Sequence, residues 1–234
     1  MRFSGWSNRK LGHSYYPRFN PGWQHCLPGG AIWNNGNLTI TYSTLSNNHT
    51  TNSGNITNYS TLTIINSTFS GNTSLSSLSG IYNWGTLSMQ STTMANIGHI
   101  SAIYHFSGAG KTAFLKDNIF KAEPGQSNCY IQPGSTWTSG GYNIANDNSC
   151  QLTAPGDLSS VDPQLGSFDY WGGPTKTIML NPDSPAINHR PGVCQTVLFQ
   201  IEDDQRHWSR NDGKCDTGAY EFSPWYLYLP LITK

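Results

Sequence analysis

A pattern with a period of about 22 to 26 residues recurs along the first half of the sequence, within the range that is typical of solenoid proteins. Four copies are recognisable, each with apolar residues at corresponding places. Equivalent apolar positions are occupied by Ile32, Ile56, Ile81 and Ile103, and by Leu45, Phe69, Met94 and Phe120. A repeat this short cannot bury its apolar face alone, so the copies are expected to stack on one another.

Apolar and polar residues alternate within each copy, as in Leu38-Thr39-Ile40 and Leu62-Thr63-Ile64. This period of two is typical of a half-buried strand, and the repeats show no sustained helical spacing. We therefore expect an all-β right-handed parallel β-helix, a solenoid closed at one end by a disulfide-stapled C-terminal segment. The expected divisions are an irregular lead-in over 1–28, β-helix repeats over 29–124, a closing segment over 125–222 and a tail over 223–234.

An asparagine recurs at one turn of the repeat. Asn34, Asn58 and Asn83 occupy equivalent positions, and His105 stands there in the fourth copy. Side-chain amides stacked one coil apart can hydrogen-bond along the axis and pair turn backbone groups that would otherwise be buried without partners. Asn is also a favoured turn residue, so we interpret this column as structural rather than as a ligand site.

Aromatic residues fall at two outward positions of successive coils. Trp33, Tyr82 and Tyr104 occupy one position, and Tyr59, Trp84 and Phe106 occupy the other. Aromatic columns on a sheet stabilise it by stacking, which is the simpler interpretation. The alternative is a flat platform for sugar rings, because exposed apolar rows on a polar surface often mark interaction sites.

Charged residues are scarce: they make up 11% of the chain, and 13 basic side chains balance 13 acidic ones. A neutral surface does not attract polyanions, so nucleic acid and anionic membranes are not expected as partners, whereas carbohydrate or other surface proteins are. The apolar stretch near the C-terminus is far shorter than the ~20 residues of a transmembrane helix, so no transmembrane segment is expected.

The five cysteines are Cys26, Cys129, Cys150, Cys194 and Cys215. They form no C-x-x-C motif and no zinc-type spacing, so we expect no metal site. The last four fall into two pairs of similar separation, which favours disulfides 129–150 and 194–215 and leaves Cys26 over, although two other pairings stay open. Disulfides indicate an oxidising compartment, so an extracellular or cell-surface location is expected. The basic N-terminus lacks a following apolar region, so the export signal is expected outside this chain.

Two further groups of residues suggest chemistry only weakly. The segment Gly108-Ala109-Gly110-Lys111-Thr112 resembles part of a phosphate-binding loop, but the glycine required earlier is His105 and no helix is expected after it. We interpret it as a loop insertion, and we expect no cofactor. The C-terminal charges are expected to form structural ion pairs or turn caps, because Asp and Gly alternate there in turn-like order. The alternative is a Ca²⁺ site formed from the same oxygens, although calcium-loop spacing is absent. The charges are Asp203, Asp204, Asp212, Asp216 and Glu221, with Arg206 and Arg210.

Short motifs in both halves resemble known bacterial β-helix families. Gly29-Gly30-Ala31-Ile32 and Phe69-Ser70-Gly71-Asn72 are similar to the GGAI and FxxN motifs of the polymorphic outer-membrane-protein type repeat. An ordered C-terminal series resembles the segment that closes right-handed β-helix proteins of the choice-of-anchor Q type. It comprises 140–144 with Cys150, 162–166, 172–175, 184–187, 204–206 and 215–221. The family commonly has Gly after its Asp-Gln-Arg, where this chain has His207-Trp208. The resemblance covers about residues 29–222 and implies a secreted or surface-attached β-helix without established chemistry.

Two functions follow as hypotheses. The first is a non-enzymatic secreted or cell-surface module used in adhesion, envelope attachment or glycan interaction. The second is the C-terminal part of a polysaccharide-degrading β-helix enzyme, a lyase or a glycoside hydrolase. Such enzymes need paired carboxylates or a base with cationic support, and Asp117 and Glu123 are the only acids of the repeats. We therefore name no catalytic residue and favour the first hypothesis.

Overall fold

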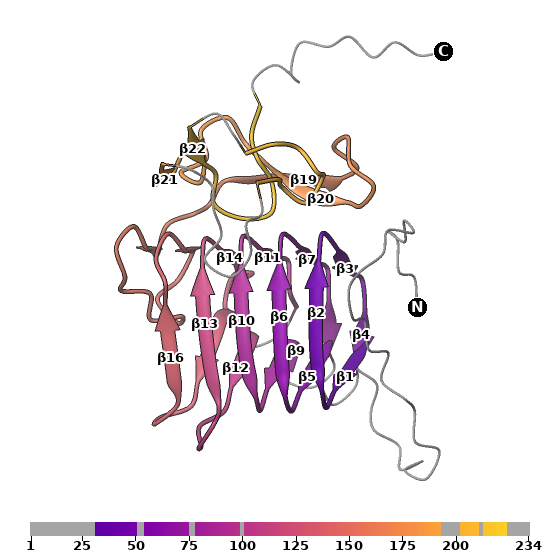
Figure 1. Cartoon of the computed structure of the whole chain (residues 1–234), viewed down its shortest axis with the longest axis vertical. Coiled ribbons are helices and arrows are strands. Elements are labelled where there is room, and N and C mark those ends of the chain that lie inside the picture. The colour runs from indigo at the N-terminus through magenta and orange to yellow at the C-terminus, as the bar shows by residue number, and fades with distance from the viewer. Residues whose placement is uncertain are drawn as a thin grey trace.

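The computed structural model describes residues 31–50, 54–74, 78–98, 101–192, 202–210 and 213–223. Every regular element within these ranges is a β-strand, and parallel sheets stack into a β-solenoid (Figure 1). The all-β solenoid expected from the repeat is confirmed. The predicted lead-in over 1–28 and most of the tail over 223–234 lie outside the described residues.

Three parallel sheets run along the solenoid. Sheet 1 contains β1 (Ile32–Asn34), β5 (Ile56–Asn58), β9 (Leu78–Asn83), β12 (Ser101–His105) and β15 (Ser127–Ile131). Sheet 2 contains β2 (Asn37–Thr41), β6 (Thr61–Ile65), β10 (Thr86–Gln90), β13 (Thr112–Lys116) and β16 (Thr136–Ser139). Sheet 3 contains β3 (Thr44–Ser46), β7 (Thr68–Ser70), β11 (Thr93–Ala95), β14 (Ile119–Lys121), β17 (Ile144–Ala145) and β18 (Leu158–Ser159). A short additional pair is formed by β4 (His49–Thr50) and β8 (Thr73–Ser74).

In-register pairing places equivalent side chains above one another, and these columns form the core. In sheet 1 the column is Ile32, Ile56, Ile81 and Ile103. In sheet 3 it is Leu45, Phe69, Met94 and Phe120. All of them are buried except Ile32, which is partly exposed at the first coil. Both columns predicted from the repeat are confirmed.

One residue in the left-handed conformation bends the chain between sheet 2 and sheet 3 in every coil. The bend residues are Tyr42, Asn66, Ser91, Asp117 and Tyr142, with φ between 44° and 58°. Residues other than glycine adopt this conformation mainly as single residues in turns, and here a single such residue forms each bend. Because successive bends are alike, the strands on either side keep the same register from coil to coil.

The parallel stack extends past residue 124, where the repeat ceases to be recognisable in the sequence. β15, β16 and β17 continue the three sheets, and β18 follows β17 in sheet 3. The repeat pattern in the sequence does not reveal this coil, because its core residues differ from those of the other coils. Cys129 takes the place of the stacked isoleucines, and Trp137 pairs with Ala113. Parallel strands thus continue to Ser159, within the predicted closing segment over 125–222. From here on we use the name closing segment for the described residues after Ser159, which add no strand to the three sheets.

A disulfide joins Cys129 to Cys150, which confirms one of the two predicted bridges. It ties the last strand of sheet 1 to the loop that follows β17. Cys215 is also disulfide-bonded. Cys194 and Cys26 lie outside the described residues, so the partner of Cys215 stays a prediction.

The closing segment contains two antiparallel pairs, β19 (Leu165–Asp169) with β20 (Thr177–Leu180) and β21 (Arg190–Pro191) with β22 (Lys214–Cys215). Contrary to the prediction from sequence, it lies along one side of the solenoid and not over its end, above β3, β7, β11 and β14 in Figure 1.

An outward column of sheet 3 explains this position. The column runs Thr44, Thr68, Thr93, Ile119 and Ile144, changing from polar to apolar along the axis. Gln205 of the closing segment hydrogen-bonds to Thr44 and Thr68, and the backbone N–H of Ala219 donates to Thr93 at 3.0 Å. The two isoleucines are buried in a second apolar cluster with Leu180, Ala186 and Tyr220. The segment thus matches each part of sheet 3 with groups of the same polarity.

Candidate functional site

The predicted asparagines form a continuous hydrogen-bonded column. Asn34 Nδ2 donates to Asn58 Oδ1 at 2.7 Å, and Asn58 Nδ2 donates to Asn83 Oδ1 at 2.6 Å. Asn83 Nδ2 lies 2.8 Å from His105 Nδ1, and His105 Nε2 lies 3.2 Å from the carbonyl of Thr136. The amide of Asn83 is a donor, so His105 is neutral there, with Nδ1 accepting and Nε2–H donating.

The asparagine column belongs to the framework and not to a ligand site. Asn58 is fully buried and also donates to the carbonyls of Ser60 and Thr86 at 3.1 and 3.0 Å. The amide therefore pairs both with its own turn and with the next coil, as buried polar groups must. Burial is also the largest cause that lowers the pKa of His105 below its ordinary value of 6.5. A neutral imidazole can accept, at its Nδ1, the hydrogen bond that the Asn83 amide donates.

Seven aromatic side chains lie together on the outer side of sheet 1 and the turns that follow its strands. We call them the aromatic strip: Trp33, Tyr59, Tyr82, Trp84, Tyr104, Phe106 and Tyr130. Six of them were predicted from the repeat. Tyr130 was missed because it belongs to the coil that the sequence hides, although it is directly paired with Tyr104.

Ring contacts connect the whole strip. Trp33 contacts Tyr59 with ring centroids 4.7 Å apart, and the rings of Tyr59 and Trp84 are nearly parallel, with centroids 6.2 Å apart. Trp84 stacks on Phe106 at 3.6 Å. Such contacts are worth about 0.5–1.5 kcal/mol each beyond burial, so stacking among the rings holds the strip in place.

The strip is open at its edges and covered at its centre. Trp33 and Tyr59 are each 42% exposed and Tyr130 is 44% exposed, whereas Phe106 is only 7% exposed. Phe106 thus supports the neighbouring rings and does not itself present a contact face, unlike the role predicted for it. Thr57 interrupts the column between Trp33 and Tyr82 and is buried. The accessible part therefore runs along the edges of the strip.

Partial burial also affects the tyrosines within the strip. Desolvation is the largest cause that raises the pKa of Tyr82 and of Tyr104 above the ordinary value of 10.0. Their hydroxyl groups therefore stay protonated at neutral pH and can donate hydrogen bonds. The strip offers hydroxyl donors and acceptors beside its ring faces.

A shallow hollow of about 280 Å³ lies beside the strip. Tyr59 and Trp84 line it together with the turn residues 60–61 and 85–86 and the loop residues 109–111. The loop is the insertion that partly resembles a phosphate-binding motif, and the strand β13 follows it, not a helix. The Lys111 Nζ lies 4.4 Å from the centroid of the Trp84 ring, within cation–π range. Sequence reasoning identified this lysine but assigned it no role.

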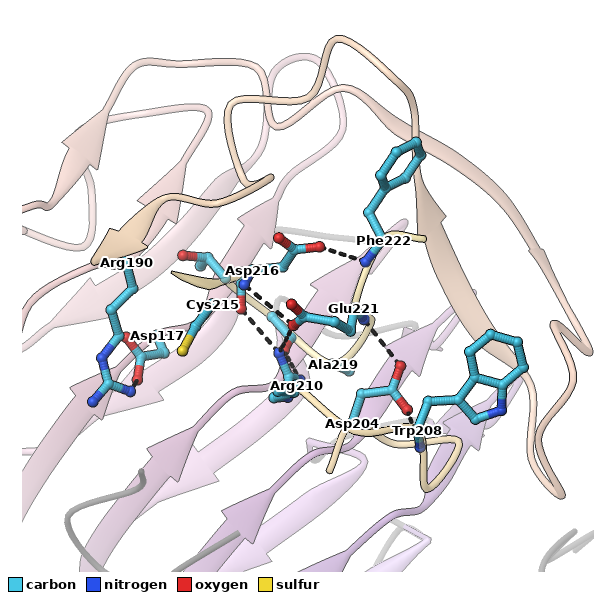
Figure 2. A network of polar contacts seen from close by, with 12 residues as sticks. Asp117, Arg190, Asp204, Trp208, Arg210, Cys215, Asp216, Ala219, Glu221 and Phe222 are labelled. Carbon is cyan, nitrogen blue, oxygen red and sulfur yellow. Dashed lines mark hydrogen bonds and ion pairs between the residues drawn. The ribbon is translucent and has the colours of Figure 1, made fainter. Parts of the chain in front are cut away.

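The charged residues of the closing segment form a buried network. The Arg206 guanidinium contacts Asp204 at 2.6 Å, with both side chains almost completely buried. Arg210 contacts Glu221 at 2.9 Å (Figure 2). It also donates to the carbonyls of Asp216 and Gly218.

Each of these charges has a partner within the chain, so the network holds the segment together. Asp204 also accepts hydrogen bonds from the backbone N–H groups of Trp208 and Glu221 at 3.1 and 3.0 Å. Asp203 contributes its backbone carbonyl, which accepts from Asn66 at 2.6 Å, and Asp212 lies outside the described residues. Within the described ranges, no three His, Cys, Asp or Glu side chains are grouped so that they could hold a metal ion.

No part of the chain that the structure describes forms a helix long and apolar enough to span a bilayer. No family model matches the sequence, and no curated protein and no solved structure matches it either.

Proposed function

We propose that this chain is a non-enzymatic solenoid module that binds carbohydrate through the aromatic strip. The observation that carries the proposal is the continuous, partly exposed row of rings, from Trp33 at one end to Tyr130 at the other, with a hollow beside Trp84. Large connected apolar surfaces on a polar protein mark interaction sites. The C–H face of a sugar ring packs on an aromatic face, while its hydroxyls need polar neighbours such as the Tyr82 and Tyr104 phenols.

The surroundings of the strip favour binding over catalysis. The first 116 residues contain no Asp or Glu, and no carboxylate of the described ranges lines the hollow. A glycosidase needs two carboxylates on either side of the scissile bond. Asp117, the first acid of the chain, is buried and paired with Arg190 at 2.8 Å on the side of the closing segment. Retention of a polysaccharide without its cleavage is therefore the expected behaviour.

We further propose that the protein works outside the cytoplasm, on the surface of a cell or released from it. Two observations support this location: the Cys129–Cys150 disulfide, a bond typical of oxidising compartments, and a surface rich in Asn, Ser and Thr. The motif resemblance to choice-of-anchor Q proteins and to polymorphic outer-membrane-protein repeats is consistent with it. Adhesion to glycans of an envelope or matrix is the role that fits best.

Affinity electrophoresis of the full chain through gels that contain single polysaccharides tests this proposal. Wild-type protein is expected to be retarded by at least one of them. Tyr59→Ala removes an exposed ring and is expected to weaken binding by about fivefold or more. Tyr170→Ala is the matched control, because Tyr170 is 53% exposed but lies in the closing segment. Its mobility is expected to equal that of the wild type.

A parallel assay for reducing ends and for unsaturated uronate products separates binding from turnover. No product is expected with any retained polysaccharide. Retardation by no polysaccharide, or equal retardation of wild type and Tyr59→Ala, would contradict the platform. Product release that increases with enzyme concentration would instead support the alternative of a polysaccharide-degrading enzyme.

A further inference from the structure

The loop over 108–111 places a lysine ammonium beside the hollow. The backbone N–H of Lys111 donates to the backbone carbonyl of Gly108 at 3.1 Å, so the loop turns back on itself. A Cβ on Gly108 would approach Lys111 Cε to 3.2 Å and Nζ to 3.3 Å, and φ of Gly108 is 133°, which favours glycine. The lysine side chain therefore lies between the Gly108 backbone and the Trp84 ring. The loop holds it in place rather than leaving it free in solvent.

No acid among the described residues forms an ion pair with Lys111. Lys121 and Lys176 form exposed ion pairs with Asp162 and Asp169 at 2.9 and 3.1 Å. Lys111 forms no ion pair with any residue that the structure describes, and the sequence has no acid before Asp117. Its contacts are instead with the faces of Trp84 and Phe106. The hollow thus combines aromatic faces, turn backbone groups and one cation.

We infer that the hollow beside Trp84 binds a uronic acid unit of an acidic polysaccharide, with the sugar ring against Tyr59 and Trp84 and its carboxylate at Lys111. This inference rests on the proposed function and names its ligand class. A uronate combines the two features that the hollow complements: a C–H face for the rings and an anionic group at the ring's edge. A neutral sugar would leave the lysine without a counter-ion.

Matched pairs of ligands isolate the contribution of the charge. The probes are oligogalacturonate, oligomannuronate and oligoglucuronate, each compared with its methyl ester, which keeps the ring and loses the charge. Isothermal titration of the full chain is expected to show at least one acid binding about two- to fivefold tighter than its ester, as for a favourable ion pair near a protein surface. The preference is expected to shrink as salt is added, because salt screens exposed charges.

Two lysine variants locate the effect. Lys111→Gln is expected to abolish the preference for the acid while keeping the affinity for the ester. Lys176→Gln changes the net charge equally but lies in the closing segment, so it is expected to keep the preference.

The outcomes distinguish this inference from the proposed function. Equal affinity of every acid and its ester, or an acid preference that survives in Lys111→Gln, would overturn the uronate site and leave the platform intact. An equal loss of affinity for acid and ester in Lys111→Gln would also overturn it, because the lysine would then only support Trp84. Binding of neither acids, esters nor any neutral polysaccharide would overturn both.

Discussion

The coils and the closing segment bury their polar groups in different ways. In the coils, neutral amides pair with copies of themselves one strand away, as Asn34, Asn58 and Asn83 do. In the closing segment, charged side chains pair with one another, Arg206 with Asp204 within one loop and Arg210 with Glu221 eleven residues further along the chain. The asparagine ladder repeats along the solenoid axis, whereas the charged network of the closing segment forms only once.

Because of this difference, we expect the coils and the closing segment to have different roles. The Arg206–Asp204 and Arg210–Glu221 pairs of the closing segment are buried, and they hold irregular chain against sheet 3. The first three coils, over 31–98, contain no Asp, Glu, Lys or Arg, so their turns are paired without charge. The outer side of sheet 1 carries the aromatic strip, and the ammonium of Lys111 lies beside Trp84. We therefore expect substitutions in the closing segment to affect stability and substitutions on the strip to affect binding.

The largest effect is expected from Phe69→Asp in the coils. Phe69 is completely buried in the column between Leu45 and Met94, so the variant would bury a carboxylate among apolar side chains. The repeat region is expected to unfold, with loss of the β-sheet circular dichroism signal. Thr39→Asp is the control on an exposed position of sheet 2 and is expected to stay folded. An unchanged melting temperature of Phe69→Asp would contradict the in-register core.

Asp204→Asn tests the charged network of the closing segment. Removing one partner of a buried pair leaves the Arg206 charge uncompensated, which typically costs about 3–5 kcal/mol. Urea unfolding monitored by tryptophan fluorescence measures this loss. Asp169→Asn, in an exposed ion pair, is the control and is expected to leave the midpoint unchanged. If Asp204→Asn and Asp169→Asn unfold at the same urea concentration, the network does not hold the segment.

Asn58→Ala tests the ladder in the coils. It leaves the amides of Asn34 and Asn83 each without one partner, and a buried unpaired group costs about 1–3 kcal/mol. Asn34→Ala, at the end of the described column, is expected to cost less in the same urea titration. Equal losses for the two variants would show that the asparagines act through their own turns alone.

Acid titration of His105 is expected to give the smallest effect. Burial lowers the pKa of His105 in the folded chain, so the unfolded chain binds its proton first as the pH falls below 6.5. This contribution to stability is therefore complete well above pH 6.5 and is lost as the pH falls through 6.5 toward the lower pKa of the folded chain. His189, whose pKa burial also lowers, contributes in the same direction. His105→Asn is expected to reduce the decline, and an identical pH profile would contradict it.

Sequence periodicity predicts the coils because each coil contacts mainly its neighbours, about one repeat away. Ile56 pairs with Ile32 and Ile81, and that spacing is visible in the sequence itself. The same logic placed the asparagine column and the strip. It failed for Tyr130 and Cys129, which belong to a coil that keeps the backbone pattern but replaces the side chains that identify it.

The position of the closing segment could not be predicted from the repeat. Gln205 contacts Thr44 across a sequence separation of 161 residues, and Asn66 contacts the carbonyl of Asp203 across 137. Nothing periodic encodes such pairs. The burial of Phe106 could not be predicted either, because a strand pattern shows which way a side chain points but not whether its neighbours shield it from solvent.

Indole N–H signals in NMR spectra of the ¹⁵N-labelled chain test the central claim most directly, since the tryptophans among the described residues are spread over the strip, the core and the closing segment. During titration with a retained oligosaccharide, the signals of Trp33 and Trp84 are expected to shift, with Trp84 shifting most. Those of Trp171 and Trp208 in the closing segment are expected to stay in place. Shifts confined to Trp171 and Trp208 would contradict carbohydrate binding by the aromatic strip.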